Sequence, residues 1–383
     1  MNLFRKTFAE INLSSLKHNV DWIKTHFPQS PFLCPMVKGN AYGHGDIIIA
    51  KALSEMNVSH LGVCLIEEAL WIKNAGVKTP LVVFRGFDNE GAKEIIRNGF
   101  IPIVSQWEQI EYLEKNIKEA AIPIHLKFDT GMNRLGFNVK EADKLFERFW
   151  KHPKLRVKAL VTHLYQGEDF LISEGHSQRQ LQKINQVASQ FSSLKPIVHT
   201  LNSAGIVGSF LQKKHLQTQY GLRPGLLIYG YQSPMLNTND PLPSLKPVMS
   251  IKSIVSDIRH ISKGEGVSYS HTWIAKRDSV IAIIPIGYAD GIHRQLSNKG
   301  EVIIRNKKAP IVGSICMDYL MVDLTEIMSE VEITKNEEVI LFGANKDQSL
   351  LLGADEVANK VQTITWEVLT SIGVRVPRVI SNS

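Results

Sequence analysis

The sequence contains few cysteines, no long hydrophobic run and no secretion signal. Its cysteines, Cys34, Cys64 and Cys316, lie far apart among 383 residues, and none forms a C-x-x-C pair. This spacing argues against a zinc knuckle or redox motif, and a sparse, odd count is typical of a reducing cytoplasm. No stretch approaches the ~18 apolar residues that a membrane helix requires. Because the basic start, residues 1–6, leads into no apolar run, we expect a cytoplasmic protein without a membrane segment.

The charges are not gathered into a surface for nucleic acid. The net charge is +7, from 44 Lys and Arg against 37 Asp and Glu, which by itself favours an anionic partner. The sequence nevertheless has no long basic block and no arginine-rich arm. We therefore expect no nucleic-acid partner, and a small anionic ligand stays open.

Several motifs of catalysis and nucleotide binding are missing as well. The sequence has no P-loop, no H-E-x-x-H, no G-x-S-x-G and no intact G-x-G-x-x-G. It has 13 histidines, but no spacing among them supports a metal site. We therefore expect no metal centre.

What the sequence does contain is a regular alternation of short apolar runs and amphipathic stretches. Between the runs, apolar residues recur at spacings of three and four, as at Trp107, Ile110 and Leu113, which predicts helices. The apolar runs are 32–37, 60–64, 80–84, 100–104, 124–128, 157–162, 197–201 and 225–229. Eight strand-then-helix units predict an α/β fold with a (β/α)8 TIM barrel. A doubly wound sheet gives a similar rhythm, but it has no reason to stop at eight.

After residue 240 the pattern changes to strands separated by turns. Pro241, Pro243 and Pro247 mark a linker or turn. The strand-like runs that follow are 248–254, 280–286, 302–305, 311–315, 320–324 and 339–342, and a helical stretch at 354–369 closes the chain. We therefore predict a barrel domain at 11–240 and a β-rich domain at 241–383, with residues 1–10 as a candidate edge strand of the second.

Chemically versatile residues follow the predicted barrel strands, where the active sites of such barrels lie. The first strand runs into Lys38, and burial favours the neutral amine that a Schiff base requires. Arg134 follows the fifth strand and could clamp a carboxylate, and His163 follows the sixth. Ser203 and the backbone near Gly225 lie in the loops that usually bind phosphate in this fold. A lysine, an arginine and a phosphate cradle at one mouth together predict pyridoxal phosphate.

The longer motifs resemble those of the alanine racemases. Residues 35–45, PMVKGNAYGHG, are similar to the cofactor-lysine signature of that family. The segments at 127–136, 222–225, 266–269 and 313–318 agree in the same order, so the resemblance spans nearly the whole chain. It implies a fold-type III pyridoxal-phosphate enzyme that interconverts L- and D-alanine and supplies D-alanine for peptidoglycan. It also implies a homodimer whose active sites each draw on both subunits.

The resemblance also implies a role for individual residues. Lys38 would hold the cofactor and act as the base on one face of the α-carbon, and Tyr269 of the partner chain would act on the other face with help from His163 and Arg223. Arg134 and the backbone near Met317 would hold the substrate carboxylate. The cofactor would be bound by Lys38, Tyr42, His163, Asn202, Ser203, Arg223, Gly225 and Leu226. Because Arg223 would face the pyridine nitrogen and keep it unprotonated, side reactions such as transamination should be suppressed.

Two further positions follow from the resemblance. Lys127 matches a position where some members carry a lysine carbamate that braces the substrate arginine, so we predict a carbamate on Lys127, with an ordinary salt-bridging lysine as the alternative. Val374 stands where many members have a tyrosine near the cofactor. We therefore expect one polar contact near the cofactor to be lost and the tolerance of the pocket for side chains to differ there.

Three other functions compete with alanine racemisation. A racemase of broader range, acting on serine, lysine or arginine, differs only in its pocket, and one methylene discriminates by only ~1–3 kcal/mol. A non-catalytic carrier of pyridoxal phosphate would need Lys38 but not Tyr269 or Met317. An amino-acid decarboxylase of the same plan would profit from a carboxylate at the pyridine nitrogen, where this chain presents Arg223.

Overall fold

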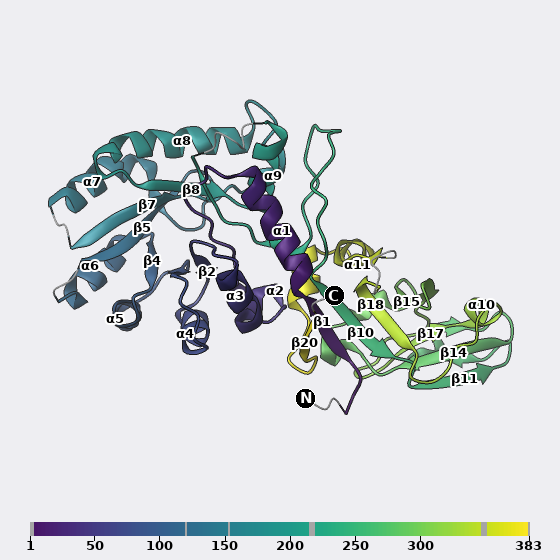
Figure 1. The fold of residues 1–383 in the computed structure, drawn as a ribbon. Coiled ribbons are helices and arrows are strands. Elements are labelled where there is room, and N and C mark those ends of the chain that lie inside the picture. Colours follow the sequence, from purple (N-terminus) through teal and green to yellow (C-terminus); the bar gives the residue numbers. More distant parts are fainter. Residues whose placement is uncertain (1–3, 119–120, 152–153, 214–218, 346–350, 382–383) are drawn as a thin grey trace.

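The computed structural model describes residues 4–118, 121–151, 154–213, 219–345 and 351–381, and it contains a parallel barrel joined to a β-rich domain (Figure 1). The barrel strands are hydrogen-bonded in the order β2 (Leu61–Val63), β3 (Leu81–Val83), β4 (Ile101–Val104), β5 (Ile122–Asp129), β7 (Leu155–Val161), β8 (Ile197–Leu201) and β9 (Gly221–Leu222). All neighbours on this path are parallel, and the short β6 (Phe137–Asn138) pairs with β5 outside it. The predicted (β/α)8 fold class is confirmed.

Residues 33–37 close the barrel between its first and last strands. The Cys34 amide donates to the Leu222 carbonyl at 2.9 Å, and the Gly62 amide donates to the Pro35 carbonyl at 2.9 Å. The segment therefore occupies the eighth strand position, although it forms only isolated bridges to β9 and β2.

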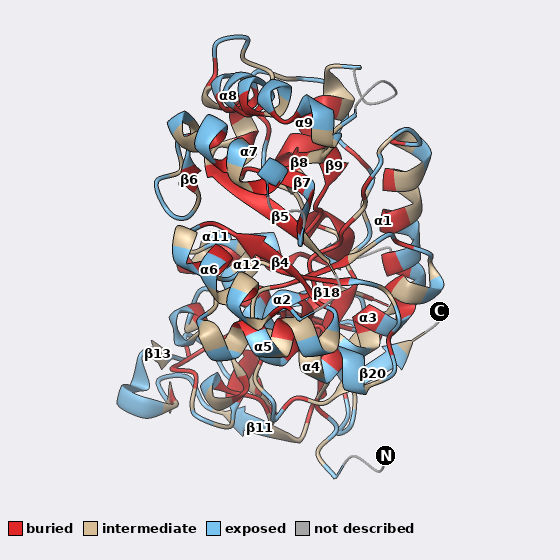
Figure 2. Cartoon of the chain, turned by 90° about the vertical axis from the view of Figure 1, so that its left-hand side faces the viewer, coloured by how far each residue is buried: buried red, intermediate tan, exposed pale blue. Residues whose placement is uncertain are grey.

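Helices cover the outside of the barrel, and most of them are amphipathic, whereas α9 is apolar and largely buried. They are α1 (Leu13–His26), α3 (Asp46–Glu55), α4 (Ile66–Asn74), α5 (Asn89–Asn98), α6 (Trp107–Asn116), α7 (Ala142–Lys151), α8 (His176–Gln190) and α9 (Ser203–Leu211). Figure 2 shows buried strands inside and helices with exposed outer faces. β2, β3 and β4 are apolar and buried along their length, as is usual in parallel sheets. β5 and β8 also carry buried polar side chains, among them His125, Lys127 and His199.

The second domain is built on two sheets, which are antiparallel except where β1 and β20 pair in parallel in the larger one. The larger one has the order β16 (Lys307–Pro310), β15 (Glu301–Ile304), β18 (Glu338–Ala344), β10 (Met249–Ile254), β1 (Phe8–Asn12) and β20 (Arg378–Ser381), with β19 (Leu351–Leu352) beside β18. The smaller sheet contains β11 (Asp257–Ile261), β14 (Ser279–Ile284) and β17 (Leu320–Asp323), and β12 (Gly266–Val267) pairs with β13 (Trp273–Ile274). Helices α10 (Thr325–Met328), α11 (Ala354–Val361) and α12 (Thr365–Thr370) complete the domain. β1 lies between β10 and β20, so it is an interior strand and not the predicted edge strand.

Three predicted elements differ in the structure. The apolar run 225–229 is not the eighth strand: Leu226–Tyr229 form a 3₁₀ turn, since Pro224 has no amide hydrogen and the Ile228 amide donates back to the Gly225 carbonyl. The helix expected over 354–369 is divided into α11 and α12, because Gln362 adopts a φ of 58°. The strand expected at 311–315 is only an isolated bridge at Ile311, and β16 precedes it.

Candidate functional site

A cavity of about 750 Å³ opens at the carboxyl ends of the barrel strands. Its wall contains nearly all of the residues predicted to hold the cofactor and the substrate: Lys38, Tyr42, Lys127, Arg134, His163, Asn202, Ser203, Arg223, Gly225 and Leu226. They follow different strands, and parallel strands bring those loops to one end of the barrel. The barrel therefore gathers these groups around one cavity.

Lys38 stands at the start of a left-handed turn, α2 (Lys38–Tyr42). Gly39, Asn40, Ala41 and Tyr42 have φ values of 61°, 54°, 51° and 53°. The Ala41 amide donates to the Val37 carbonyl at 2.9 Å, and the Gly43 amide donates to the Gly39 carbonyl at 3.0 Å. A non-glycine residue in this conformation costs roughly 1–2 kcal/mol. The surrounding contacts must therefore hold the turn that carries Lys38.

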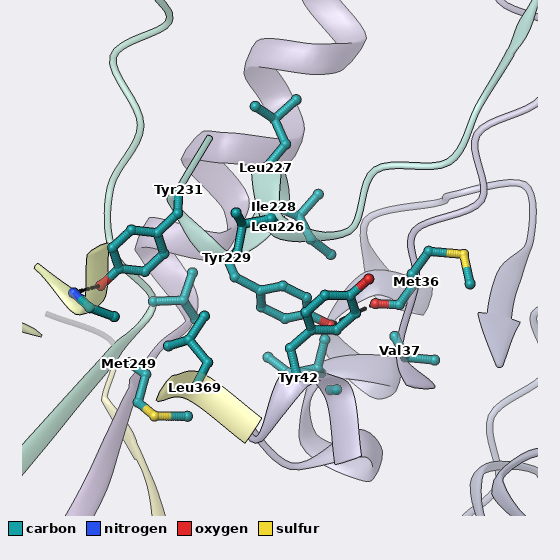
Figure 3. Close-up of a cluster of buried hydrophobic side chains, with 14 of the residues drawn as sticks. Met36, Val37, Tyr42, Leu226, Leu227, Ile228, Tyr229, Tyr231, Met249 and Leu369 are labelled. Carbon is teal, nitrogen blue, oxygen red and sulfur yellow. Dashed lines mark hydrogen bonds between the residues drawn. The ribbon is translucent and has the colours of Figure 1, made fainter. Parts of the chain in front are cut away.

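Buried aromatic rings lie beneath this turn (Figure 3). The Tyr229 hydroxyl donates to the Met36 carbonyl at 2.8 Å, and the rings of Tyr42 and Tyr229 lie 5.0 Å apart. His44 stacks on Tyr229 at 4.4 Å, and its Nδ1 lies 3.0 Å from the carbonyls of both Ala41 and Tyr42. The core thereby ties the turn to the 3₁₀ turn Leu226–Tyr229.

A set of hydrogen-bond donors converges near the start of that 3₁₀ turn. The amides of Gly225 and Leu227 donate to the Ser203 Oγ at 3.0 and 3.2 Å. A Cβ at Gly225 would come within 2.4 Å of the Tyr42 hydroxyl, so a larger residue there would displace the Tyr42 side chain. Tyr42, Ser203 and Gly225 line the same cavity, and two hydroxyls beside glycine backbone are suited to a phosphate group. The residues present therefore fit a phosphate-bearing cofactor.

A buried chain of hydrogen bonds holds the Arg223 side chain. Its Nη1 donates to the Nδ1 of His199 at 2.9 Å, and the Nε2 of His199 lies 3.0 Å from the Nδ1 of His125. Because a guanidinium can only donate, both imidazoles must be neutral with Nε2 protonated. Burial lowers the pKa of His125 to about 3, and burial with the charge of Arg223 places that of His199 well below its usual range. The chain therefore fixes a cation at the cavity without a carboxylate partner.

Several cationic side chains line the same wall of the cavity. Burial and the charges of Arg134 and Arg223 lower the pKa of Lys127 to about 8. Burial, then Arg223, places the pKa of His163 well below its ordinary value, so that its imidazole is neutral. Burial lowers the pKa of Arg223 only to about 10, which leaves it charged near neutrality. The cavity is therefore electropositive and suited to anionic groups.

The two remaining predicted residues, Tyr269 and Met317, lie elsewhere in this single chain. They share a surface hollow of the second domain with Ser268, Cys316 and Asp318, and their side chains are 71% and 52% exposed. The backbone supports this hollow, since the Tyr288 and Ala289 amides each donate at 3.1 Å to the carbonyls of Cys316 and Met317. One chain alone therefore does not bring Tyr269 to Lys38.

Sequence reasoning missed several residues of the cavity wall. They are Glu68, Arg85, Glu168, Trp366 and Thr370. A signal existed for Glu68, which stands at the third position of α4, where a glutamate often caps a helix. For Trp366 and Thr370 there was none, because α12 reaches the barrel only through the arrangement of the two domains. In the described ranges no group of three His, Cys, Asp or Glu side chains could hold a metal ion. No helix there is long and apolar enough to cross a membrane.

Comparisons with known families and proteins match the whole chain. The family described as "Alanine racemase, N-terminal domain" matches residues 11–233, and "Alanine racemase, C-terminal domain" matches residues 248–380. An alanine racemase of Thermodesulfovibrio yellowstonii is 36% identical over 378 residues, which cover 97% of this chain and 96% of that protein. Alanine racemase 1 of Bacillus subtilis is 32% identical over 386 residues, covering 98% and 93%.

Solved structures give the same match. The alanine racemase of Bacillus anthracis with bound L-Ala-P superposes with a TM-score of 0.86 at 29% identity, covering 100% of this chain and 96% of that one. The alanine racemase of Bartonella henselae with covalently bound pyridoxal phosphate superposes with a TM-score of 0.83 at 31% identity, covering 98% and 99%.

Proposed function

We propose, from the premise that this chain belongs to the alanine racemase family of isomerases, that it interconverts L- and D-alanine with pyridoxal phosphate bound in the barrel cavity. The observation that carries the proposal is the convergence in one cavity of Lys38, the donors around Ser203 and the buried Arg223. When bound, pyridoxal phosphate supplies an electron sink that stabilises negative charge at the α-carbon of an amino acid.

The cavity residues divide the binding of that cofactor among themselves. Lys38 would hold the aldehyde covalently, and Tyr42, Ser203 and the amides near Gly225 would hold the phosphate, as their convergence supports. Arg223 would donate to the pyridine nitrogen and keep it unprotonated. His163, Asn202 and Leu226 line the remaining wall of the cavity.

The proton transfers are assigned to one residue on each side of the α-carbon. The Lys38 amine takes or returns the proton on one face. Tyr269 of a second copy does the same on the other, since its exposure in the single chain leaves it free to enter a partner's cavity. A tyrosine hydroxyl is a weak base near neutrality, and the neutral His163 and the charged Arg223 are the neighbours that would assist it. The site is therefore completed by a homodimer.

The substrate carboxylate is assigned to Arg134 and to the backbone near Met317 of the partner copy. Arg134 lies on the loop after β5, close enough to Lys127 for its charge to lower the pKa of that lysine. If Lys127 reacts with carbon dioxide, a bond forms between Nζ and the carbon and one proton is released. The resulting carbamate carries a negative charge that would brace Arg134.

The proposal extends to the division of labour between the domains, the use of the product and the cellular compartment. The chain divides functionally at about residue 240, into a cofactor-binding domain at 11–240 and a domain at 241–383 that serves the partner. The product D-alanine feeds peptidoglycan synthesis. All three cysteines are free, which is usual in a reducing cytoplasm, where we place the reaction.

The test begins with the absorbance spectrum of the purified protein and with chiral chromatography of its products from L-alanine and D-alanine. We expect a visible band from bound cofactor and racemisation in both directions. Lys38→Ala should remove the band and reduce racemisation by more than ~10⁴-fold, since the covalent link and a base are lost together. Retained activity in this variant would refute the role of Lys38. The wild-type gene, but not the variant, should restore growth without D-alanine to a bacterium that lacks its racemase.

A further inference from the structure

The left-handed turn α2 is an unusual place for a reactive lysine. Asn40, Ala41 and Tyr42 all have positive φ values, which asparagine tolerates but alanine and tyrosine adopt rarely. Such a conformation persists only where surrounding contacts determine it, and it is found at functional sites. The contacts that hold the beginning of this turn, next to Lys38, therefore bear on function.

One buried carboxylate holds the beginning of the turn. The Oε1 of Glu68 accepts a hydrogen bond from the Gly39 amide at 2.7 Å. Its Oε2 accepts from the amides of Cys64 and Leu65, at 2.7 and 3.0 Å. Glu68 is 6% exposed and lines the cavity beside Lys38 and Gly39. It thus joins the end of β2 and the start of α4 to the turn.

The contact with Gly39 acts directly on Lys38. The amide of Gly39 belongs to the same peptide unit as the Lys38 carbonyl, and that unit is planar. The hydrogen bond to the Gly39 N–H therefore fixes the orientation of the Lys38–Gly39 peptide plane, and with it the direction of the backbone at Lys38. Further along the turn, the Arg378 Nε donates to the Gly43 carbonyl at 2.9 Å, so the two ends are held by different side chains.

We infer that Glu68 is a positioning residue, which holds the Lys38–Gly39 peptide in the left-handed turn and so aims the Lys38 amine into the cavity. The inference rests on the proposed role of Lys38. Both carboxylate oxygens of Glu68 are occupied as acceptors. A glutamine has one acceptor oxygen, so it could serve either Gly39 or the pair Cys64 and Leu65, and its amide group would oppose the other.

The chain offers a matched control and a second variant. Glu67 precedes Glu68 in the first turn of α4 and is exposed, so Glu67→Gln removes the same charge without touching the turn. Glu68→Asp keeps the charge and stays near the amides of Cys64 and Leu65, but it is too short to reach Gly39 as well. Glu68→Asp therefore removes the hydrogen bond to Gly39 while it keeps those that stabilise the first turn of α4.

The experiment measures hydrogen exchange by mass spectrometry on the protein as purified with its cofactor, following a peptide that covers residues 38–43. In Glu68→Gln and Glu68→Asp we expect the Gly39 amide to exchange about 10- to 100-fold faster, as loss of a hydrogen bond to a charged acceptor implies. Hydroxylamine should release the cofactor from Lys38 several-fold faster. The kcat should fall while KM for alanine stays nearly constant, because Arg134 is untouched.

The inference is overturned if both variants keep the wild-type exchange at 38–43, or if Glu67→Gln matches them. A melting curve shows whether the Glu68→Gln protein is folded. If it is not, the exchange measured in Glu68→Asp decides whether Glu68 holds the turn. Failure of the proposed function looks different: the wild-type protein itself would show no visible band and no racemisation. Exchange at Gly39 would still show whether Glu68 holds the turn.

Discussion

The barrel cavity and the hollow around Tyr269 hold their functional side chains in opposite ways. In the cavity, Arg223 is 4% exposed and has hydrogen-bond partners on several backbone carbonyls and on His199. In the hollow, Tyr269 is largely exposed, and Met317 and Tyr319 beside it are also open to solvent. Exposed tyrosine and methionine are typical of protein interfaces. The first region is organised by its own chain, whereas the second is suited to receive another copy.

The largest effect is expected when Lys38 and Tyr269 are removed from different chains of the same dimer. In a cell that co-expresses Lys38→Ala and Tyr269→Phe chains, half of the dimers are mixed, and each mixed dimer has one site with both residues intact. We expect about a quarter of the wild-type racemisation, although each variant alone is nearly inactive. The rate of D-alanine formation by the purified mixture measures it. No recovery would mean that both residues act within one chain.

A second variant tests whether the two sides of the α-carbon are served by different residues. Tyr269→Phe should slow racemisation by about 10²–10⁴-fold, the contribution of a general base. The rate of proton removal should fall more for one enantiomer than for the other, because Lys38 remains as the base on one face. Exchange of the α-proton with deuterated water, followed from each enantiomer, measures the difference. Tyr319→Phe, in the same hollow, is the control, and an equal loss from both enantiomers would contradict the two-base assignment.

The charged wall of the cavity predicts a pH dependence at Lys127. With the pKa of Lys127 near 8, the neutral amine that reacts with carbon dioxide rises from roughly a tenth to roughly nine-tenths between pH 7 and 9. Carbamate on Lys127 should therefore increase with pH. Carbon-13 NMR with labelled bicarbonate measures it, and Lys127→Met should remove the signal. A carbamate signal independent of Lys127, or none at pH 9, would refute the modification.

The smallest effect is expected at Val374, which is 96% exposed in this chain. Val374→Tyr supplies the hydroxyl that many family members have at this position. We expect kcat/KM for serine relative to alanine to fall by less than about tenfold, since a pocket contact discriminates weakly between such side chains. Chiral chromatography with each amino acid measures the ratio. A rise in the ratio would show that Val374 does not widen the pocket.

Secondary structure was predicted best from the sequence where the burial of a segment and its apolar periodicity agree. The buried strands β2 to β4 are short apolar runs followed by helical spacing, so they were found within a residue or two. Leu226–Tyr229 is equally apolar, but its backbone follows a proline and a glycine and turns. The exposed β11 has charged and polar residues at Asp257, Arg259 and His260, so it lacked the apolar signal and was missed.

The site divides in the same manner. Lys38 and Ser203 could be located because each follows a predicted strand, and parallel strands place such residues at one end. Arg223 precedes the predicted eighth strand, so it was assigned only through the family resemblance. The left-handed turn was not predicted, since alanine and tyrosine give no sign of positive φ, although asparagine favours it more than most residues do. Glu68 could not be assigned either, because its role depends on the distance between α4 and a turn that precedes it by 29 residues.

The position of β1 also has a consequence for the order in which the protein can fold during synthesis. β1 begins at Phe8, yet its neighbours in the sheet are β10 and β20, and Ala9 pairs with Arg378. During synthesis β1 therefore waits for β20, which follows it by most of the described residues, before both of its edges are covered. Since an unpaired edge is a template for aggregation, the newly made chain must shield these residues until β20 has been made.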